Sequence, residues 1–159
     1  MGSGTHPLSL PIGRLCGPGR IGVTTRLDDR YGLLLHFVQG SVKLHHLVNA
    51  IEASLDLGLA ERVLWNFTRG DLAEFTTADL EVLFEHLVAS PWAPRKCALL
   101  CSSGALSLAA AAAVTMMAED SGHGERVGAF VNRESALEWL GIHEPQTTPA
   151  PPPDGEGRR

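Results

Sequence analysis

The stretch YGLLLHFVQGSVKLHHLVNAIEASL, residues 31–55, places a strand directly before a helix. Residues 31–38 are apolar at nearly every position, which is typical of a strand covered on both faces. Apolar residues then recur at helical spacing with polar residues opposite them: Leu44, Leu47, Val48, Ile51 and Leu55 against His45, Asn49, Glu52 and Asp56. Ser41 is a good N-cap for this helix, and Gly58 is well placed to end it.

Further strands and helices alternate on both sides of this unit. Residues 20–26 form a candidate strand, and the polar turn at Asp28, Asp29 and Arg30 joins it to residues 31–38 in a hairpin. Residues 62–67 follow as a short buried strand, and residues 68–74 as a polar loop. Thr76 and Asp79 then fit a capping box. An apolar stripe marks the next helix and consists of Leu80, Leu83, Phe84 and Leu87. Pro91 and Pro94 are expected to end this helix.

The uncharged stretch of residues 97–118 is long enough to span a bilayer, but Ser102, Ser103 and Gly104 interrupt it. We therefore interpret it as a buried strand at 97–101, a turn, and a buried helix at 105–119. Ser102 or Ser103 can cap that helix, and the alanines at 109–113 make it thin enough to pack close to a sheet. A loop at 121–125, a strand at 127–131 and a short helix capped by Asn132 and ended by Gly141 complete the chain.

The order β-β-α-β-α-β-α-β-α predicts an α/β fold with a mixed, mostly parallel sheet of about five strands and about four helices. The 159 residues favour one domain at 20–142. We expect residues 1–19 to form a flexible arm and residues 143–159 a disordered proline-rich tail, because neither segment has enough apolar residues to offset the entropy of ordering.

Composition narrows the classes of partner. The net charge is −5, and Lys and Arg are scattered along the chain, so we expect no nucleic acid partner. The N-terminal residues lack a basic start followed by an apolar run, so we expect a cytoplasmic protein without stable membrane insertion. Three cysteines do not make a disulfide framework: Cys97 and Cys101 would lie ~13 Å apart along a strand, too far to bridge.

With this order of elements, the chain resembles the STAS family of anti-sigma-factor antagonists over about residues 20–142. Within it, the chain is similar to the stage II sporulation protein AA-like branch, which is also compared with Sec14-type lipid-binding domains. The segment RVGAFVNRESALEWLG at 126–141 carries most of this resemblance, together with VLWNFTRGDLAEFTTADL at 63–80. The resemblance implies a regulatory domain without catalytic activity or cofactor that binds a protein partner.

Antagonists that are switched by phosphorylation have an acidic residue at the end of the central strand and an Asp-Ser-Ser-Gly-like run at the next helix start. This chain has Asn66 at the first place and Glu74, Phe75, Thr76, Thr77 and Ala78 at the second. Thr76 and Thr77 are therefore candidate phosphoacceptors, with plain capping of the helix as the alternative. We expect Asn66, Thr68, Phe75, Ser102 and Ser103 to form a partner or ligand surface around them.

Two alternatives to a protein-binding domain remain. The thin alanine face at 109–113 could leave room beside the sheet for a small apolar, lipid-like ligand, or it could simply allow close packing. Ser102 or Ser103 with a histidine could form a small hydrolase, although residues 101–105 do not match the nucleophile elbow of hydrolases. None of the seven histidines has the ligand spacing of a zinc-binding helix, so we expect no metal site.

Overall fold

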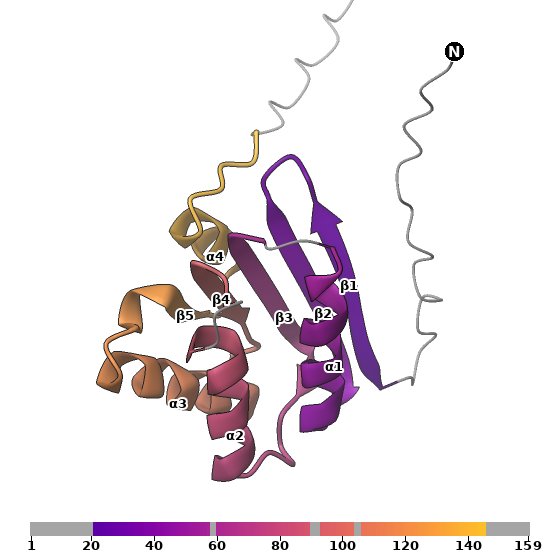
Figure 1. The fold of residues 1–159 in the computed structure, drawn as a ribbon, viewed down its shortest axis with the longest axis vertical. Helices are drawn as coiled ribbons and strands as arrows, with labels where there is room; N and C mark the ends of the chain where they lie inside the picture. The colour runs from indigo at the N-terminus through magenta and orange to yellow at the C-terminus, as the bar shows by residue number, and fades with distance from the viewer. Residues whose placement is uncertain (1–20, 58–59, 90–92, 104–105, 146–159) are drawn as a thin grey trace, which may run out of the picture.

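The computed structural model describes residues 21–57, 60–89, 93–103 and 106–145. Its five strands are β1 (Gly22–Asp28), β2 (Leu33–Ser41), β3 (Arg62–Asp71), β4 (Lys96–Leu100) and β5 (Val127–Phe130). They form one sheet in the order β1-β2-β3-β4-β5, in which β1 and β2 are antiparallel and every later pair is parallel (Figure 1). The predicted α/β fold with a mixed, mostly parallel sheet is confirmed.

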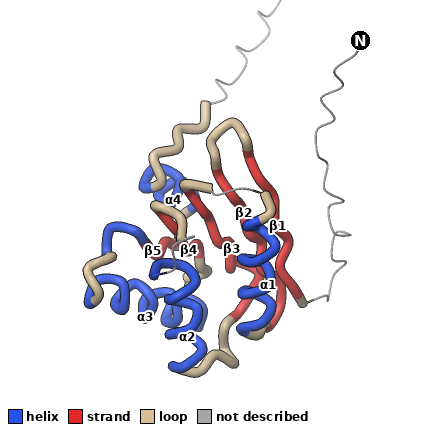
Figure 2. The backbone as a smooth tube through the Cα atoms, viewed as in Figure 1, coloured by secondary structure: helices blue, strands red, loops and turns tan. Residues whose placement is uncertain are grey.

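The helices follow the strands in the predicted order. They are α1 (Leu44–Leu55), α2 (Thr77–Phe84), α3 (Leu106–Asp120) and α4 (Arg133–Trp139). Helix α2 runs on into a π-helical turn, η1 (Glu85–Ala89), and a 3-10 turn, η2 (Gly124–Arg126), precedes β5. In Figure 2, α4 lies apart from the other three helices.

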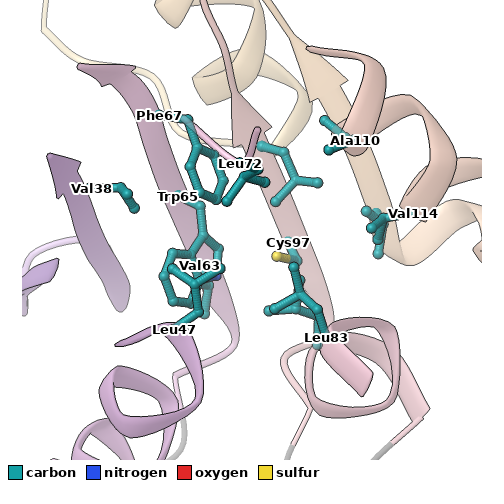
Figure 3. Close-up of a cluster of buried hydrophobic side chains, with 14 of the residues drawn as sticks. Val38, Leu47, Val63, Trp65, Phe67, Leu72, Leu83, Cys97, Ala110 and Val114 are labelled. Carbon is teal, nitrogen blue, oxygen red and sulfur yellow. The ribbon is translucent and has the colours of Figure 1, made fainter. Parts of the chain in front are cut away.

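The two faces of the sheet are covered unequally. Helices α1, α2 and α3 contribute to one large buried cluster with the side chains of alternate strand residues, among them Val38, Val63, Trp65, Phe67 and Cys97 (Figure 3). The opposite face is covered by α4 and the residues after it, which pack on a smaller cluster: Leu33, Leu35, Leu64, Ala98 and Leu100 against Ala136, Leu137, Leu140 and Ile142. Because α4 has only seven residues, it cannot cover this face completely.

This limited cover corrects the prediction that β2 is buried on both faces. Leu33, Leu34 and Leu35 are buried, but the side chain of Phe37 is 41% exposed. Phe37 lies on the α4 face, in register with Thr24 on one side and Asn66 on the other. The sequence pattern of residues 31–38 could not show this exposure, because it depends on where a helix a hundred residues later ends.

The start of α1 also differs from the prediction. Ser41 is the last residue of β2, where it pairs with Asp71, so it is not the N-cap. The N-cap is Lys43, whose backbone N–H donates to Nδ1 of His46 at 2.9 Å. The side chain of His46 therefore satisfies a backbone donor at this helix start, in place of the serine hydroxyl. Gly58, proposed to end α1, lies outside the described residues.

The two later capping predictions are confirmed. The Thr76 side chain accepts from the N–H of Asp79, and the Asn132 side chain accepts from the N–H of Ser135. Gly141, just after α4, has a φ of 75°, the left-handed conformation that glycine adopts readily at the end of a helix.

The uncharged stretch at 97–118 is divided between β4 and α3, as predicted. Ala110, Ala111, Val114 and Ala118 of α3 are buried, so its small side chains pack in the main cluster. In the part of the chain that the structure describes, no helix combines the length and the apolarity needed to cross a membrane.

Several predicted features lie outside the described residues. They include the arm at 1–19, the tail from residue 146 onward, Pro91, and Gly104, which is predicted to interrupt the uncharged stretch at 97–118. Of the tail predicted at 143–159, residues 143–145 are described, and there Glu144 Oε1 pairs with Arg133 Nη2 at 3.0 Å.

Candidate functional site

Asn66, Thr68 and Ser102 are joined by hydrogen bonds at the level of the sheet where β4 and β5 end and β2 and β3 continue. Oδ1 of Asn66 accepts from both the backbone N–H and the hydroxyl of Thr68, at 3.0 and 2.6 Å. The hydroxyl of Ser102, two residues after β4, donates to the carbonyl oxygen of Thr68 at 3.0 Å. The structure thus brings together three of the five residues that the sequence suggested for a partner surface.

A bulge in β3 produces this arrangement. Phe37 is paired with Asn66 and Gln39 with Arg69, so two residues of β3, Phe67 and Thr68, oppose the single residue Val38. An inserted residue of this kind bends the strand and leaves backbone groups without ladder partners. Asn66 and Ser102 supply partners to the N–H and the carbonyl of Thr68. The prediction of a loop at 68–74 is therefore wrong in its first part, because β3 continues through Asp71 beside β2.

Phe37 adds an exposed apolar side chain next to this polar group. It is the register partner of Asn66 on the α4 face, and its 41% exposure is large for a phenylalanine in a central strand. Val131, at the end of β5, is also exposed. Sequence reasoning did not select Phe37, because a strand of this composition is usually buried on both faces.

The start of α2 contains the two candidate phosphoacceptors, and their hydroxyls differ in environment. Oγ1 of Thr76 accepts from the N–H of Asp79 at 3.2 Å, while the Asp79 carboxylate accepts from the N–H of Thr76 at 2.9 Å. Thr77 is the first residue of the helix and is exposed. Phe75, just before them, is half-buried and packs against the main cluster. No hydrogen bond within the described residues joins Thr76 or Thr77 to Asn66, Thr68 or Ser102.

The two serines were also candidates for a nucleophile. The Ser102 hydroxyl donates to a backbone carbonyl instead of to a histidine. Ser103 is exposed, and within the described residues its hydroxyl forms no hydrogen bond with a histidine. The arrangement therefore lacks, within these residues, the base that activates a serine by accepting its proton.

The described histidines do not gather around a metal site. His45 and His46 lie side by side at the start of α1, with ring centroids 4.1 Å apart, whereas His36 is buried in β2. Across residues 21–57, 60–89, 93–103 and 106–145, no group of three or more His, Cys, Asp or Glu side chains is arranged to hold a metal ion.

Burial shifts the pKa of two interior groups. Desolvation lowers the pKa of His36 to about 3 and raises the pKa of the Cys97 thiol to about 12. His36 is therefore neutral and Cys97 a thiol at neutral pH. Nδ1 of His36 lies 2.8 Å from Oγ1 of Thr25 on the neighbouring strand. Both side chains project from the face of the sheet opposite the side chains of Phe37 and Asn66.

Comparison with known protein families finds no family that matches this chain, and none of the curated proteins matches it.

Proposed function

We propose that this chain is a non-catalytic interaction domain that binds a protein partner at the carboxyl edge of its sheet. We call the proposed binding region the edge surface, and it consists of Phe37, Asn66, Thr68, Phe75, Thr76, Thr77, Ser102 and Ser103. The observation that carries the proposal is an exposed phenylalanine, Phe37, directly beside the hydrogen-bonded group of Asn66, Thr68 and Ser102.

This combination has the chemistry of a protein-binding patch. Interfaces place aromatic side chains at their centre and polar groups around them. The hydrogen bonds among Asn66, Thr68 and Ser102 already fix these side chains, so a partner would not bear the full entropic cost of ordering them. The engagement of the Ser102 hydroxyl with a carbonyl favours binding over nucleophilic catalysis at this position. The resemblance to STAS domains favours the same function.

Within this proposal, Thr77 is the better candidate for phosphorylation. The hydroxyl of Thr76 already takes part in the capping box, whereas Thr77 is exposed at the first position of α2. A phosphate would add about −1.5 to −2 charge. The helix N-terminus would favour that charge, and a partner docked on the same surface would be repelled by it.

We expect phosphopeptide mapping of protein from its own cells to find phosphate on Thr77. Unmodified Thr77 in every growth state would contradict the switch without affecting partner binding.

Photo-crosslinking tests the binding proposal itself. A photoreactive phenylalanine analogue replaces Phe37 in the full chain, and a second variant carries it in place of Met116, a 63% exposed residue of α3. We expect irradiation in the source cells to yield a discrete protein adduct from position 37 that is missing from position 116. The proposal fails if position 37 gives no protein adduct, or if both positions give the same ones.

A further inference from the structure

A cavity of about 40 Å³ lies on the face of the sheet opposite Phe37, between the strands, the end of α1 and the π-helical turn η1. Most of its lining is apolar, and four of its side chains carry polar groups: His36, Ser54, Trp65 and His86. The described lining residues are Leu34, His36, Ile51, Ser54, Leu55, Ala60, Val63, Trp65, His86, Leu87 and Pro94.

The buried polar groups of the described residues converge on this cavity. His36 and Ser54 are the buried polar residues in the part of the chain that the structure describes, with 1% and 7% exposure, and both line it. Trp65 also lines it and is 1% exposed. Its indole Nε1–H is a buried donor without a hydrogen-bond partner among these residues. An unpaired buried donor costs about 1–3 kcal/mol. A hydrogen-bond acceptor bound in the cavity would remove this cost for the Trp65 indole.

The three groups offer complementary hydrogen-bonding positions. The His36 and Trp65 rings are stacked, with centroids 3.9 Å apart and an interplanar angle of 24°. The Ser54 hydroxyl donates to the carbonyl of Ile51 at 2.6 Å, which leaves its oxygen free to accept. The cavity therefore combines a donor on Trp65 with an acceptor on Ser54.

The lining favours a neutral ligand. Burial lowers the pKa of His36 to about 3, so its ring carries no charge at neutral pH. No Asp, Glu, Lys or Arg is among the described lining residues. His86 also lines the cavity, and its Nδ1 lies 2.8 Å from the carbonyl oxygen of Val82. An ion entering the cavity would lose its water and meet no Asp, Glu, Lys or Arg counter-charge among these residues, which is costly.

We propose that this cavity binds a neutral hydroxyl- or amide-bearing molecule of a few non-hydrogen atoms. Its oxygen accepts from Nε1–H of Trp65, and its own O–H or N–H donates to Oγ of Ser54. A volume of about 40 Å³ exceeds the roughly 10–15 Å³ that one water needs and is too small for a long acyl chain. The site lies on the opposite face from Phe37 and Asn66, so it does not depend on the proposed partner surface.

Acetamide is a suitable probe, with acetate as a charged molecule of the same size. The measurement is the ¹⁵N–¹H spectrum of the three tryptophan indoles in the full chain, with the Trp65 signal assigned by its loss in Trp65→Phe. We expect acetamide to shift the Trp65 signal saturably, with a Kd in the range of about 1 mM or weaker for so small a ligand. Acetate should leave the signal in place. Ser54→Ala should weaken acetamide binding about fivefold, as for the loss of one hydrogen bond.

Three outcomes would overturn the proposal. In the first, the Trp65 signal does not respond to acetamide, or moves linearly together with the other two indole signals. In the second, acetate produces the same saturable shift as acetamide. In the third, a magnetisation-transfer signal between the Trp65 N–H and water persists unchanged at the highest acetamide concentration, which would show that water alone occupies the cavity. Because the acetamide and acetate titrations use the wild-type chain, they stand even if Ser54→Ala fails to fold.

Discussion

At the scale of single residues, His36 shows how a polar side chain is kept in this core. It lies in β2, with Nδ1 2.8 Å from Oγ1 of Thr25 in β1 and its ring stacked on Trp65 of β3. These contacts satisfy one ring nitrogen and cover one face of the ring, but they supply no negative charge. The folded protein therefore favours the neutral His36 ring over the protonated one.

This arrangement predicts a loss of stability in acid. The pKa of His36 is about 3 when folded and near 6.5 in the unfolded chain, so between these values the unfolded state binds more protons. The stabilisation is complete above pH 6.5 and is lost as the pH falls below it, by up to about 1.4 kcal/mol per pH unit. We expect urea unfolding at pH 7, 6, 5 and 4 to show a shallower decline for His36→Phe than for the wild type. The exposed His45→Gln variant should follow the wild type. Equal slopes for His36→Phe and the wild type would show that His36 is not the group responsible.

Gly70 is a second residue on which the local geometry depends. It follows the bulge in β3, and a Cβ at this position would lie 2.6 Å from Cγ1 and 2.9 Å from the carbonyl oxygen of Val38. The second atom is backbone, so the neighbouring strand would have to move.

We therefore expect Gly70→Ala to destabilise the protein by about 1–3 kcal/mol, as overpacking usually does. Gly22→Ala is the matched control in β1, because a Cβ there meets no atom within 4 Å. Chemical denaturation of both variants measures the difference. If the two changes cost the same, the close approach of β2 to Gly70 is not a constraint on the fold.

At the scale of elements, α2 depends on its capping box. Thr76 and Asp79 satisfy each other's backbone N–H at the start of a helix of only eight residues. We expect Thr76→Ala to lower the free energy of unfolding by about 1 kcal/mol. Thr77→Ala removes the neighbouring hydroxyl without removing a cap, so thermal unfolding should show little change. A larger loss for Thr77→Ala than for Thr76→Ala would contradict this assignment of the cap.

The elements that sequence could predict are those set by local patterns. Apolar spacing identified α1 and α2, and side-chain chemistry identified the caps at Thr76 and Asn132. The sequence predictions were wrong where pairing with another strand determines the backbone structure. Ser41 has the chemistry of a cap, but its backbone continues the pairing of β2 with β3. For the same reason β3 extends to Asp71, beyond the point where its sequence turns polar.

The candidate site was predictable only in part. Asn66 pairs with Leu100 at the end of β4, and Thr68 and Ser102 follow these two residues, so the parallel topology brought the three to the same level of the sheet. Their hydrogen bonds depend on the bulge opposite Val38, which no local pattern indicates. The exposure of Phe37 and the cavity beside Trp65 depend on how far the helices extend over each face, which is a property of the packed chain.

At the scale of the whole molecule, the two faces of the sheet differ in how completely helices cover them. The face under α1, α2 and α3 holds the main core and the small polar cavity beside Trp65. The face under α4 is covered only over part of its area and leaves Phe37, in the middle of β2, exposed. Within the proposed partner surface, Phe37 is exposed because α4 is short.

The measurement that tests the central claim most directly compares Phe37→Asp with Met116→Asp. Both variants place a carboxylate at an exposed apolar position, but only Phe37 belongs to the edge surface. Each full-length variant is recovered from its source cells, and the amount of co-purifying partner is quantified against the wild type, after unfolding curves confirm that both variants are folded. We predict that Phe37→Asp reduces the recovered partner about tenfold or more, as for a central interface residue, while Met116→Asp retains it. Full retention by Phe37→Asp, or equal loss in both variants, would contradict the claim that this surface binds the partner.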